Sequence, residues 1–183
     1  IWNAALIKKI FLPREMFPVA SAYVAVVHFV PQLVVLLAGS LYYGWRPTVL
    51  GLAAILAGFL IVTFAALGLG LIFGCLNVFF RDSENLVDLI LMIATWVSPV
   101  LYPVEKVKNV VPEWIWHVYQ ANPVTVAVEL FHYGFWSTAT GQSVPEIGSF
   151  LVLILIGLVG SLIVLGLGQL AFKRTEGKFA QEL

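Results

Sequence analysis

The longest uncharged run in the sequence is the feature that most limits how this chain can fold. Residues 49–80 contain no Asp, Glu, Lys or Arg over 32 positions. As one helix this run would be about 48 Å long, whereas the hydrocarbon core of a bilayer is about 30 Å thick. The chain is 61% hydrophobic and 11% charged, whereas ordinary soluble domains carry about 25% charged residues. The pattern therefore predicts an all-α integral membrane protein.

Three more apolar segments bring the predicted number of membrane spans to four. Residues 19–43 and 147–172 carry no formal charge, and residues 86–102 form a shorter apolar block. Four spans place both ends of the chain on the same side of the membrane. That side would carry most of the basic residues, and the positive-inside rule then predicts cytoplasmic termini. The inner residues are Lys8, Lys9, Arg14, Arg81, Lys173, Arg174 and Lys178, and the outer ones are Arg46, Lys106 and Lys108.

Small and aromatic residues predict how the spans meet one another and the membrane surface. Gly70 and Gly74 have the four-residue spacing that lets helix backbones approach closely in lipid. Tyr42, Tyr43 and Trp45 flank the turn after the first span, and such amphipathic rings are favoured at the headgroup level. We therefore expect a close helix contact at the two glycines and all three aromatic rings at the headgroup level.

The two ends of the chain are predicted to lie at the cytoplasmic face. Residues 1–18 predict a short amphipathic helix at the membrane surface or against a partner protein, because two prolines prevent a longer helix. Residues 173–183 are predicted to form a cytoplasmic tail. The first residue is Ile and no signal-peptide pattern follows it. We therefore expect the chain to begin partway through a longer protein.

Residues 103–136 are rich in proline and aromatic residues, and they are predicted to form a helical hairpin that enters the outer leaflet and returns. Pro112 marks one helix start, since proline is tolerated at the first helical position and the next residue is a carboxylate that complements the helix dipole. Pro123 marks another, preceded by an asparagine cap. The two helices would reach Tyr119 and Trp136, and neither is long enough to cross a bilayer.

Two interpretations of the side chains in this hairpin stay open. Glu129 is the carboxylate inside the second apolar helix, and it either lines a path or gate or reaches the interface at the rim of the hairpin. The aromatic side chains either contact a substrate or form an interfacial belt. The candidate residues for an outer gate or substrate path are Trp114, Trp116, Tyr119, Glu129 and Tyr133.

The sequence contains no motif for chemistry of its own. His28, His117 and His132 lie far apart in the sequence, which predicts no metal site, and no phosphate-binding loop occurs. The single cysteine, Cys75, is expected to be a small buried side chain. The basic residues form no face for nucleic acid. Because the spans hold almost no ionisable groups, the energy for uphill transport would enter through another polypeptide.

Five segments occur in a characteristic order along the chain. They are NAALIKKIFLPREMFP (3–18), GCLNVFFRD (74–82), SPVLYP (98–103), YQANP (119–123) and FKRTEGKFA (172–180). Together they resemble the membrane (permease) subunit of ATP-binding-cassette exporters for polysaccharides, O-antigens and teichoic-acid-type polymers. The resemblance covers essentially the whole chain.

The resemblance implies six spans, of which this chain would hold the third to the sixth. It implies two permeases and two ATPase subunits in the cytoplasmic (inner) membrane of a bacterium or archaeon, with a lipid-linked glycan passing between the permeases. ATP and magnesium would bind the partner ATPase, and this chain would hold no cofactor and no catalytic residue. The segment before the first span would be the coupling helix that docks on the ATPase. Its contact residues would be Ile7, Lys8, Lys9, Arg14 and Glu15, with Arg81 and Asp82 as a second cytoplasmic contact or an internal brace.

Three other functions remain in view. The same architecture serves exporters of drugs or small lipids. A membrane-embedded enzyme acting on lipid-linked sugars would use Glu129 as its acid or base, but no second well-placed catalytic group accompanies it. The third alternative is a structural membrane scaffold.

Overall fold

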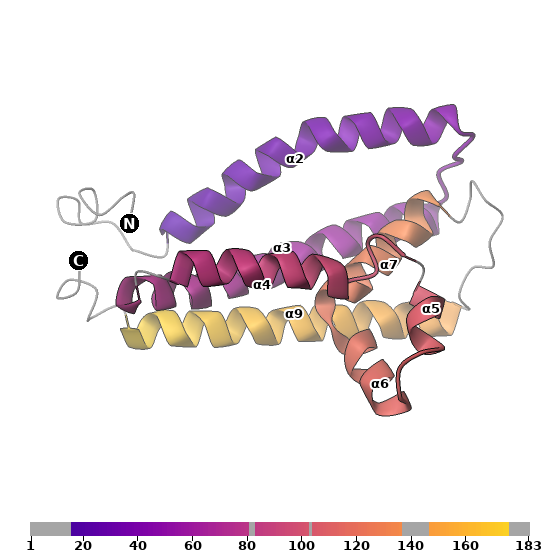
Figure 1. Cartoon of the computed structure of the whole chain (residues 1–183). Helices are drawn as coiled ribbons and strands as arrows, with labels where there is room; N and C mark the ends of the chain where they lie inside the picture. Colours follow the sequence, from indigo (N-terminus) through magenta and orange to yellow (C-terminus); the bar gives the residue numbers. More distant parts are fainter. Residues whose placement is uncertain (1–15, 81–82, 103, 137–146, 176–183) are drawn as a thin grey trace.

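The computed structural model describes residues 16–80, 83–102, 104–136 and 147–175, which are helical apart from short connections (Figure 1). No strand occurs within these ranges, and the all-α prediction is confirmed. The long helices are α2 (Met16–Tyr42), α3 (Val49–Phe79) and α9 (Ile147–Thr175). The shorter helices are α4 (Ser83–Val97), α5 (Val104–Lys108), α6 (Glu113–Ala121) and α7 (Pro123–Phe135).

Within the described residues, three helices are long and apolar enough to cross a membrane, in the segments Val19–Tyr42, Val49–Phe79 and Ser149–Thr175. The third predicted span differs from the expectation. Its helix, α4, has 15 residues, which is about 22 Å of helix, and it ends at Val97 instead of residue 102. Pro99 explains this end, because a proline disfavours helical backbone at the residue before it. Length alone therefore supports three of the four predicted spans.

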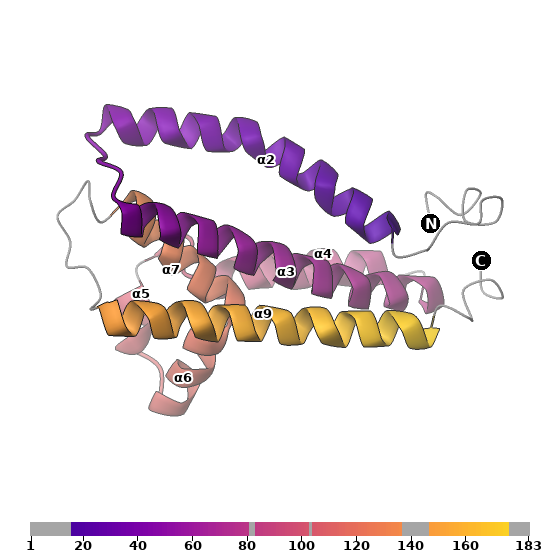
Figure 2. The ribbon, with the colours of Figure 1, turned by 180° about the vertical axis from the view of Figure 1, so that it is seen from behind.

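The ends of the long helices extend beyond the predicted spans. α2 begins at Met16, within the segment predicted to be cytoplasmic up to residue 18, and a proline is tolerated in its first turn. α9 includes Lys173 and Arg174 in its last turn, where cations complement the helix dipole. α2 bends about halfway along (Figures 1 and 2), and Pro31 inside it explains the bend because it removes one helical hydrogen bond.

α3 and α9 lie side by side and form the centre of the bundle (Figure 2). Their closest approach is at Gly68, where a Cβ atom would lie 2.6 Å from the backbone nitrogen of Leu165. The predicted contact at Gly70 and Gly74 is wrong within this chain, because a Cβ atom at either position would meet nothing within 4 Å. At about 100° per residue Gly70 lies on the opposite side of α3 from Gly68 and Gly74 lies about 120° around the helix from it, so neither shares the face of Gly68.

α7 packs against the first half of α3 and completes the main hydrophobic core. Ala127 lies beside Gly58 and Gly134 lies beside Gly51, so α7 runs antiparallel to α3. The buried residues of this core are Ala54, Ile61, Val126, Ala127, Leu130 and Phe150. A smaller cluster toward the other end of α3 holds Leu71, Phe172 and the buried Cys75, as expected for that cysteine.

The start of α2 and the end of α9 lie at one end of the bundle, and α5, α6 and α7 lie toward the other end (Figures 1 and 2). The first and last residues that the structure describes therefore lie at the same end of the bundle. α2 makes few contacts with the rest, although Phe29 stacks on Phe59 of α3 with ring centroids 5.8 Å apart.

Candidate functional site at the hairpin tip

The structure describes five of the predicted site residues. Trp114, Trp116 and Tyr119 lie on α6, and Glu129 and Tyr133 lie on α7. The predicted ATPase-coupling residues Ile7, Lys8, Lys9, Arg14 and Glu15 lie outside the described residues, as do Arg81 and Asp82.

The predicted helix starts of the hairpin are confirmed. α6 begins directly after Pro112 and α7 begins at Pro123. α6 continues to Ala121, two residues beyond its predicted end at Tyr119, and α7 ends at Phe135. The five-residue helix α5 was not predicted, because so short a segment shows no helical periodicity.

The turn between α6 and α7 is the tip of the hairpin, and it lies near the middle of the bundle. Asn122 caps α7, since its Oδ1 accepts a hydrogen bond of 3.0 Å from the backbone N–H of Val124. The ring of Pro123 contacts α9 at Gly160, where a Cβ atom would lie 3.1 Å from Pro123 Cγ. Gly160 lies about 20 Å from the start of α9 at the standard helical rise. The tip therefore reaches about halfway along α9.

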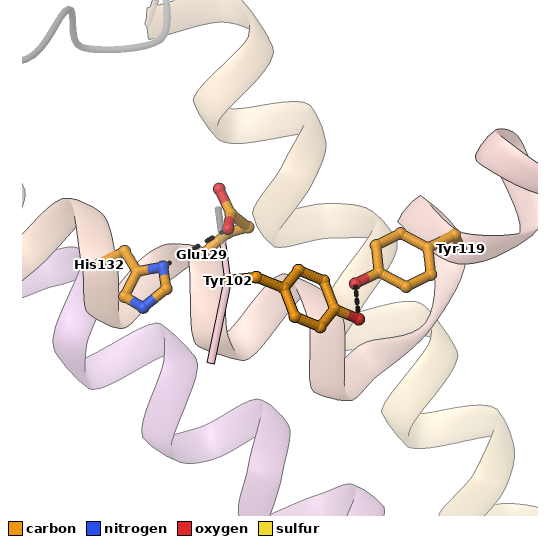
Figure 3. A network of polar contacts seen from close by, with 4 residues as sticks. All are labelled: Tyr102, Tyr119, Glu129 and His132. Carbon is orange, nitrogen blue, oxygen red and sulfur yellow. Dashed lines mark hydrogen bonds and ion pairs between the residues drawn. The ribbon is translucent and has the colours of Figure 1, made fainter. Parts of the chain in front are cut away.

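Tyr102 joins the end of α4 to this hairpin. Its hydroxyl oxygen lies 2.9 Å from the carbonyl of Trp96 and 2.8 Å from that of Val97, in the last turn of α4, where carbonyls lack helical donors. It also lies 3.4 Å from the hydroxyl of Tyr119 (Figure 3). A phenol has a single proton. Because the Tyr102 proton is donated to a carbonyl at the end of α4, the hydrogen bond between the two phenols uses the proton of Tyr119, and the Tyr102 oxygen accepts it.

The surroundings of Tyr119 keep its phenol protonated. Burial, followed by the hydrogen bond with Tyr102, raises the pKa of Tyr119, which lies outside the long apolar helices. The carboxylate of Glu129 also raises this pKa, and the hydroxyl of Thr125 lowers it. Trp116 stacks on Tyr119 with ring centroids 6.1 Å apart. Glu129 and Thr125 are therefore close enough to the Tyr119 hydroxyl to belong to the same site.

Glu129 lies beside a histidine on the same helix. Its Oε1 is 3.6 Å from Nδ1 of His132, one turn further along α7. This distance is too long for a hydrogen bond, but a protonated imidazole would pair with the carboxylate. The Glu129 side chain is 27% exposed and that of His132 is 46% exposed. Figure 3 shows two separate contacts, one between Glu129 and His132 and one between Tyr102 and Tyr119.

The hydroxyl of Thr125 differs in its hydrogen bonding from those of the other helical threonines. Its Oγ1 is buried and has no hydrogen-bond partner in the described part of the chain, and the residue is 2% exposed. The hydroxyls of Thr63 and Thr95 instead donate to carbonyls four residues earlier in their helices. Buried polar groups are nearly always partnered, because an unsatisfied one costs about 1–3 kcal/mol.

The other predicted aromatic residues have different surroundings. Trp114 is 69% exposed. Tyr133 packs on Phe150 with ring centroids 4.8 Å apart, beside the main core. Of the five predicted residues, the structure thus brings together Trp116, Tyr119 and Glu129.

Trp45, expected at the headgroup level, lies in the turn between α2 and α3 with its ring packed inside the protein. It is 6% exposed, a burial that the sequence did not predict. The preceding residue, Gly44, adopts a φ of 84° in the turn between α2 and α3, a conformation that glycine tolerates. The indole packs on Phe135 with ring centroids 5.2 Å apart and donates a hydrogen bond to Gly134.

Two residues of the site were not predicted from the sequence. Tyr102 was noted only as the last residue of the predicted span 86–102 and as part of the segment 98–103 that resembles exporters. Thr125 lies four residues before Glu129, a spacing that places two polar side chains on one face of an apolar helix. That spacing was the available signal for Thr125.

The chemistry available at this site is hydrogen bonding. The hydroxyls of Tyr102, Tyr119 and Thr125 provide donors and acceptors, and Glu129 provides acceptors. No group of three His, Cys, Asp or Glu side chains that could hold a metal occurs within the four described ranges.

Comparison with known proteins identifies relatives of the chain. A family profile described as "ABC-2 type transporter" matches residues 11–136. Two proteins of Klebsiella pneumoniae named "O-antigen export system permease protein RfbA" are each 33% identical to this chain. One aligns over 141 residues, 73% of this chain and 52% of the relative. The other aligns over 127 residues, 68% and 46% respectively. The chain thus spans about half the length of the curated relatives it matches.

Proposed function

The chain belongs to the ABC-2 type transporter family, and we propose that it is part of the permease of an exporter that moves a lipid-linked polysaccharide across the inner membrane. A separate ATPase, which binds ATP and magnesium, would drive the transport. The observation that carries this proposal is the 33% identity to two O-antigen export permeases. Membership of a transporter family also favours transport over the alternative of an enzyme that uses Glu129.

We propose that α2, α3 and α9 cross the membrane and that α4, with the turn after it, forms the fourth transmembrane segment. The hairpin of α6 and α7 would enter from the outer side. The contact between Pro123 and Gly160, halfway along α9, supports this depth. A helix that ends inside a bilayer needs partners for its last carbonyls, and Tyr102 supplies one at the end of α4.

The cytoplasmic side would hold both chain ends. Lys173 and Arg174 in the last turn of α9 support this orientation. The segment 1–18 would dock on the ATPase through Ile7, Lys8, Lys9, Arg14 and Glu15. Arg81 and Asp82, between α3 and α4, would lie at the same face. Two permease copies would form the path, as in the exporters that the sequence resembles.

Deletion and complementation of the gene test this function. Loss of the full-length protein should remove the polysaccharide from the cell surface while it accumulates inside, and antibody labelling of intact and broken cells measures both. The full-length gene should restore surface labelling with an active ATPase partner and fail to do so with a hydrolysis-deficient one. Normal surface polysaccharide in the deletion strain would refute the proposal. A change in drug sensitivity alone would indicate a small-molecule exporter.

A further inference from the structure

The helix α2 has three sides, and the described chain covers one of them. The covered side faces α3, where Phe29 stacks on Phe59. Its residues recur at intervals of three or four, the spacing of one side of a helix, and all of them are partly buried. They are Ala22, Val26, Phe29, Leu33, Leu37 and Ser40. α2 lies at one edge of the bundle (Figures 1 and 2), and its other residues from Val19 to Tyr42 are exposed.

The exposed residues of α2 form two further sides of different composition. One side carries large apolar residues, which suit lipid; they are Tyr23, Val27, Val30, Val34 and Leu41. The other side carries residues spaced alternately by four and three, and all but one of them are small or polar. They are Ser21, Ala25, His28, Gln32, Val35 and Gly39, and we call this side the α2 seam. Helix interfaces in lipid are enriched in small residues, and His and Gln side chains form hydrogen bonds across them.

The length of the α2 seam indicates what covers it. From Ser21 to Gly39 the helix rises about 27 Å, close to the hydrocarbon thickness of about 30 Å. His28 and Gln32 lie near its middle, where polar side chains that face lipid are costly and rare. A bound sugar would explain the polar middle but not the small residues toward both ends. Gly39 faces open space, since a Cβ atom there would meet nothing within 4 Å. The seam therefore fits a partner helix that crosses the membrane.

We propose that the α2 seam packs against another transmembrane helix of the full-length permease, which carries small residues and a hydrogen-bonding side chain at the depth of His28 and Gln32. The inference rests on the proposed function, in which α2 crosses the membrane. The aligned regions cover 52% and 46% of the two curated relatives, so these relatives have further chain that can supply such a helix. A second copy of α2 is the other source, and the experiment separates the two.

The test uses the full-length permease with its ATPase in membranes of the export strain. The photoreactive residue benzoylphenylalanine at Gln32 should form adducts that mass spectrometry assigns to a permease peptide outside residues 1–183. The same probe at Val34, at similar depth but about 160° around the helix, should form adducts with lipid. Adducts of the Gln32 probe with α2 of a second copy, with polysaccharide or with lipid alone would each overturn the proposal.

A substitution at Gly39 tests the same contact through packing. With the probe at Gln32, Gly39→Leu should lower the yield of the peptide adduct at least about fivefold, because the larger side chain separates the two helices. Without the probe it should lower the melting temperature of the purified permease. Val34→Leu, on the lipid side, is the control and should change neither. If Gly39 faces lipid, Gly39→Leu should leave the adduct unchanged and melt at or above the wild-type temperature, since leucine favours helix over glycine; this result would overturn the proposal.

The experiment also separates failure of the seam from failure of the proposed function. A Val34 probe without lipid adducts would show that α2 does not cross the membrane, and the seam would fall with the proposed membrane arrangement. A deletion strain that still exports polysaccharide would refute the proposed function, while the peptide adduct at Gln32 would still support the seam.

Discussion

The indole Nε1 of Trp45 donates a 2.8 Å hydrogen bond to the backbone carbonyl of Gly134, 89 residues later in the chain. Trp45 lies in the turn between α2 and α3, and Gly134 lies in the last turn of α7. Gly134 is itself pressed against Gly51 of α3, where any Cβ atom would meet the Gly51 carbonyl at 2.8 Å. The hydrogen bond therefore fixes one end of the hairpin to the connection between two long helices.

Replacing Trp45 with Phe should destabilise the protein. The substitution keeps an aromatic ring but removes the donor, so the buried Gly134 carbonyl loses its side-chain partner. We expect the free energy of unfolding to fall by about 1–3 kcal/mol, measured by denaturant titration of the purified protein in detergent. Trp114→Phe is the control, because Trp114 is largely exposed and should change stability by less than about 0.5 kcal/mol. Equal stability of Trp45→Phe and wild type would contradict the role of this bond.

Two glycines two positions apart should respond differently to the same substitution. Gly68→Ala would put a Cβ atom 2.6 Å from the Leu165 backbone and force α3 and α9 apart, which should cost about 1–3 kcal/mol of stability. Gly70→Ala meets open space and should be neutral or slightly stabilising, since alanine favours helix. Thermal melting of the two variants in one detergent makes the comparison. A larger loss for Gly70→Ala would show that the packed face of α3 is assigned incorrectly.

Local sequence signals predicted much of the fold. The uncharged run over 49–80 corresponds to α3 within one residue, and the prolines at 112 and 123 mark the starts of α6 and α7. The spacing of glycines in α3 did not predict which face of α3 packs on α9. That face is the one at Gly68, because Gly68 meets the backbone of Leu165, almost one hundred residues away. The burial of Trp45 was not predictable for the same reason, since its partner Gly134 is remote in sequence.

The candidate site was predictable only in part. Glu129 was singled out because an ionisable group is costly in an apolar helix, and Tyr119 was singled out as one of the aromatic residues of the hairpin. Thr125 was missed because a helical threonine normally bonds to the carbonyl four residues before it, as Thr63 does, and the sequence contains no sign that this bond is absent. Tyr102 was missed because its role depends on the end of α4 meeting α6 in space.

Two pairs of lysines test which face meets the ATPase. Lys8→Ala combined with Lys9→Ala should weaken ATPase binding about two- to thirtyfold, since each exposed ion pair contributes about 0.2–1 kcal/mol. Lys106→Ala combined with Lys108→Ala removes the same charge from exposed positions on α5, toward the other end of the bundle. Co-purification of the ATPase with the full-length permease measures both pairs. Equal effects of the two pairs would contradict the proposed orientation.

The depth of the hairpin tip can be measured with spin labels. In a Cys75→Ala background, a label at Ala121 should be more accessible to oxygen than to a water-soluble nickel complex, because the tip lies halfway along α9. A label at Val110, which is 83% exposed between α5 and α6, should show the opposite preference. Equal preference for the nickel complex at both positions would place the hairpin outside the bilayer.

Transport by the purified complex is the most direct measurement of the proposed function. The full-length permease and its ATPase would be reconstituted into vesicles with the ATPase facing outward, and labelled lipid-linked polysaccharide would be added with ATP and magnesium. We expect polysaccharide to become protected from an external glycosidase, and we expect no protection with a non-hydrolysable ATP analogue. Full digestion of the polysaccharide while the ATPase hydrolyses ATP at its normal rate would contradict the function proposed for this chain.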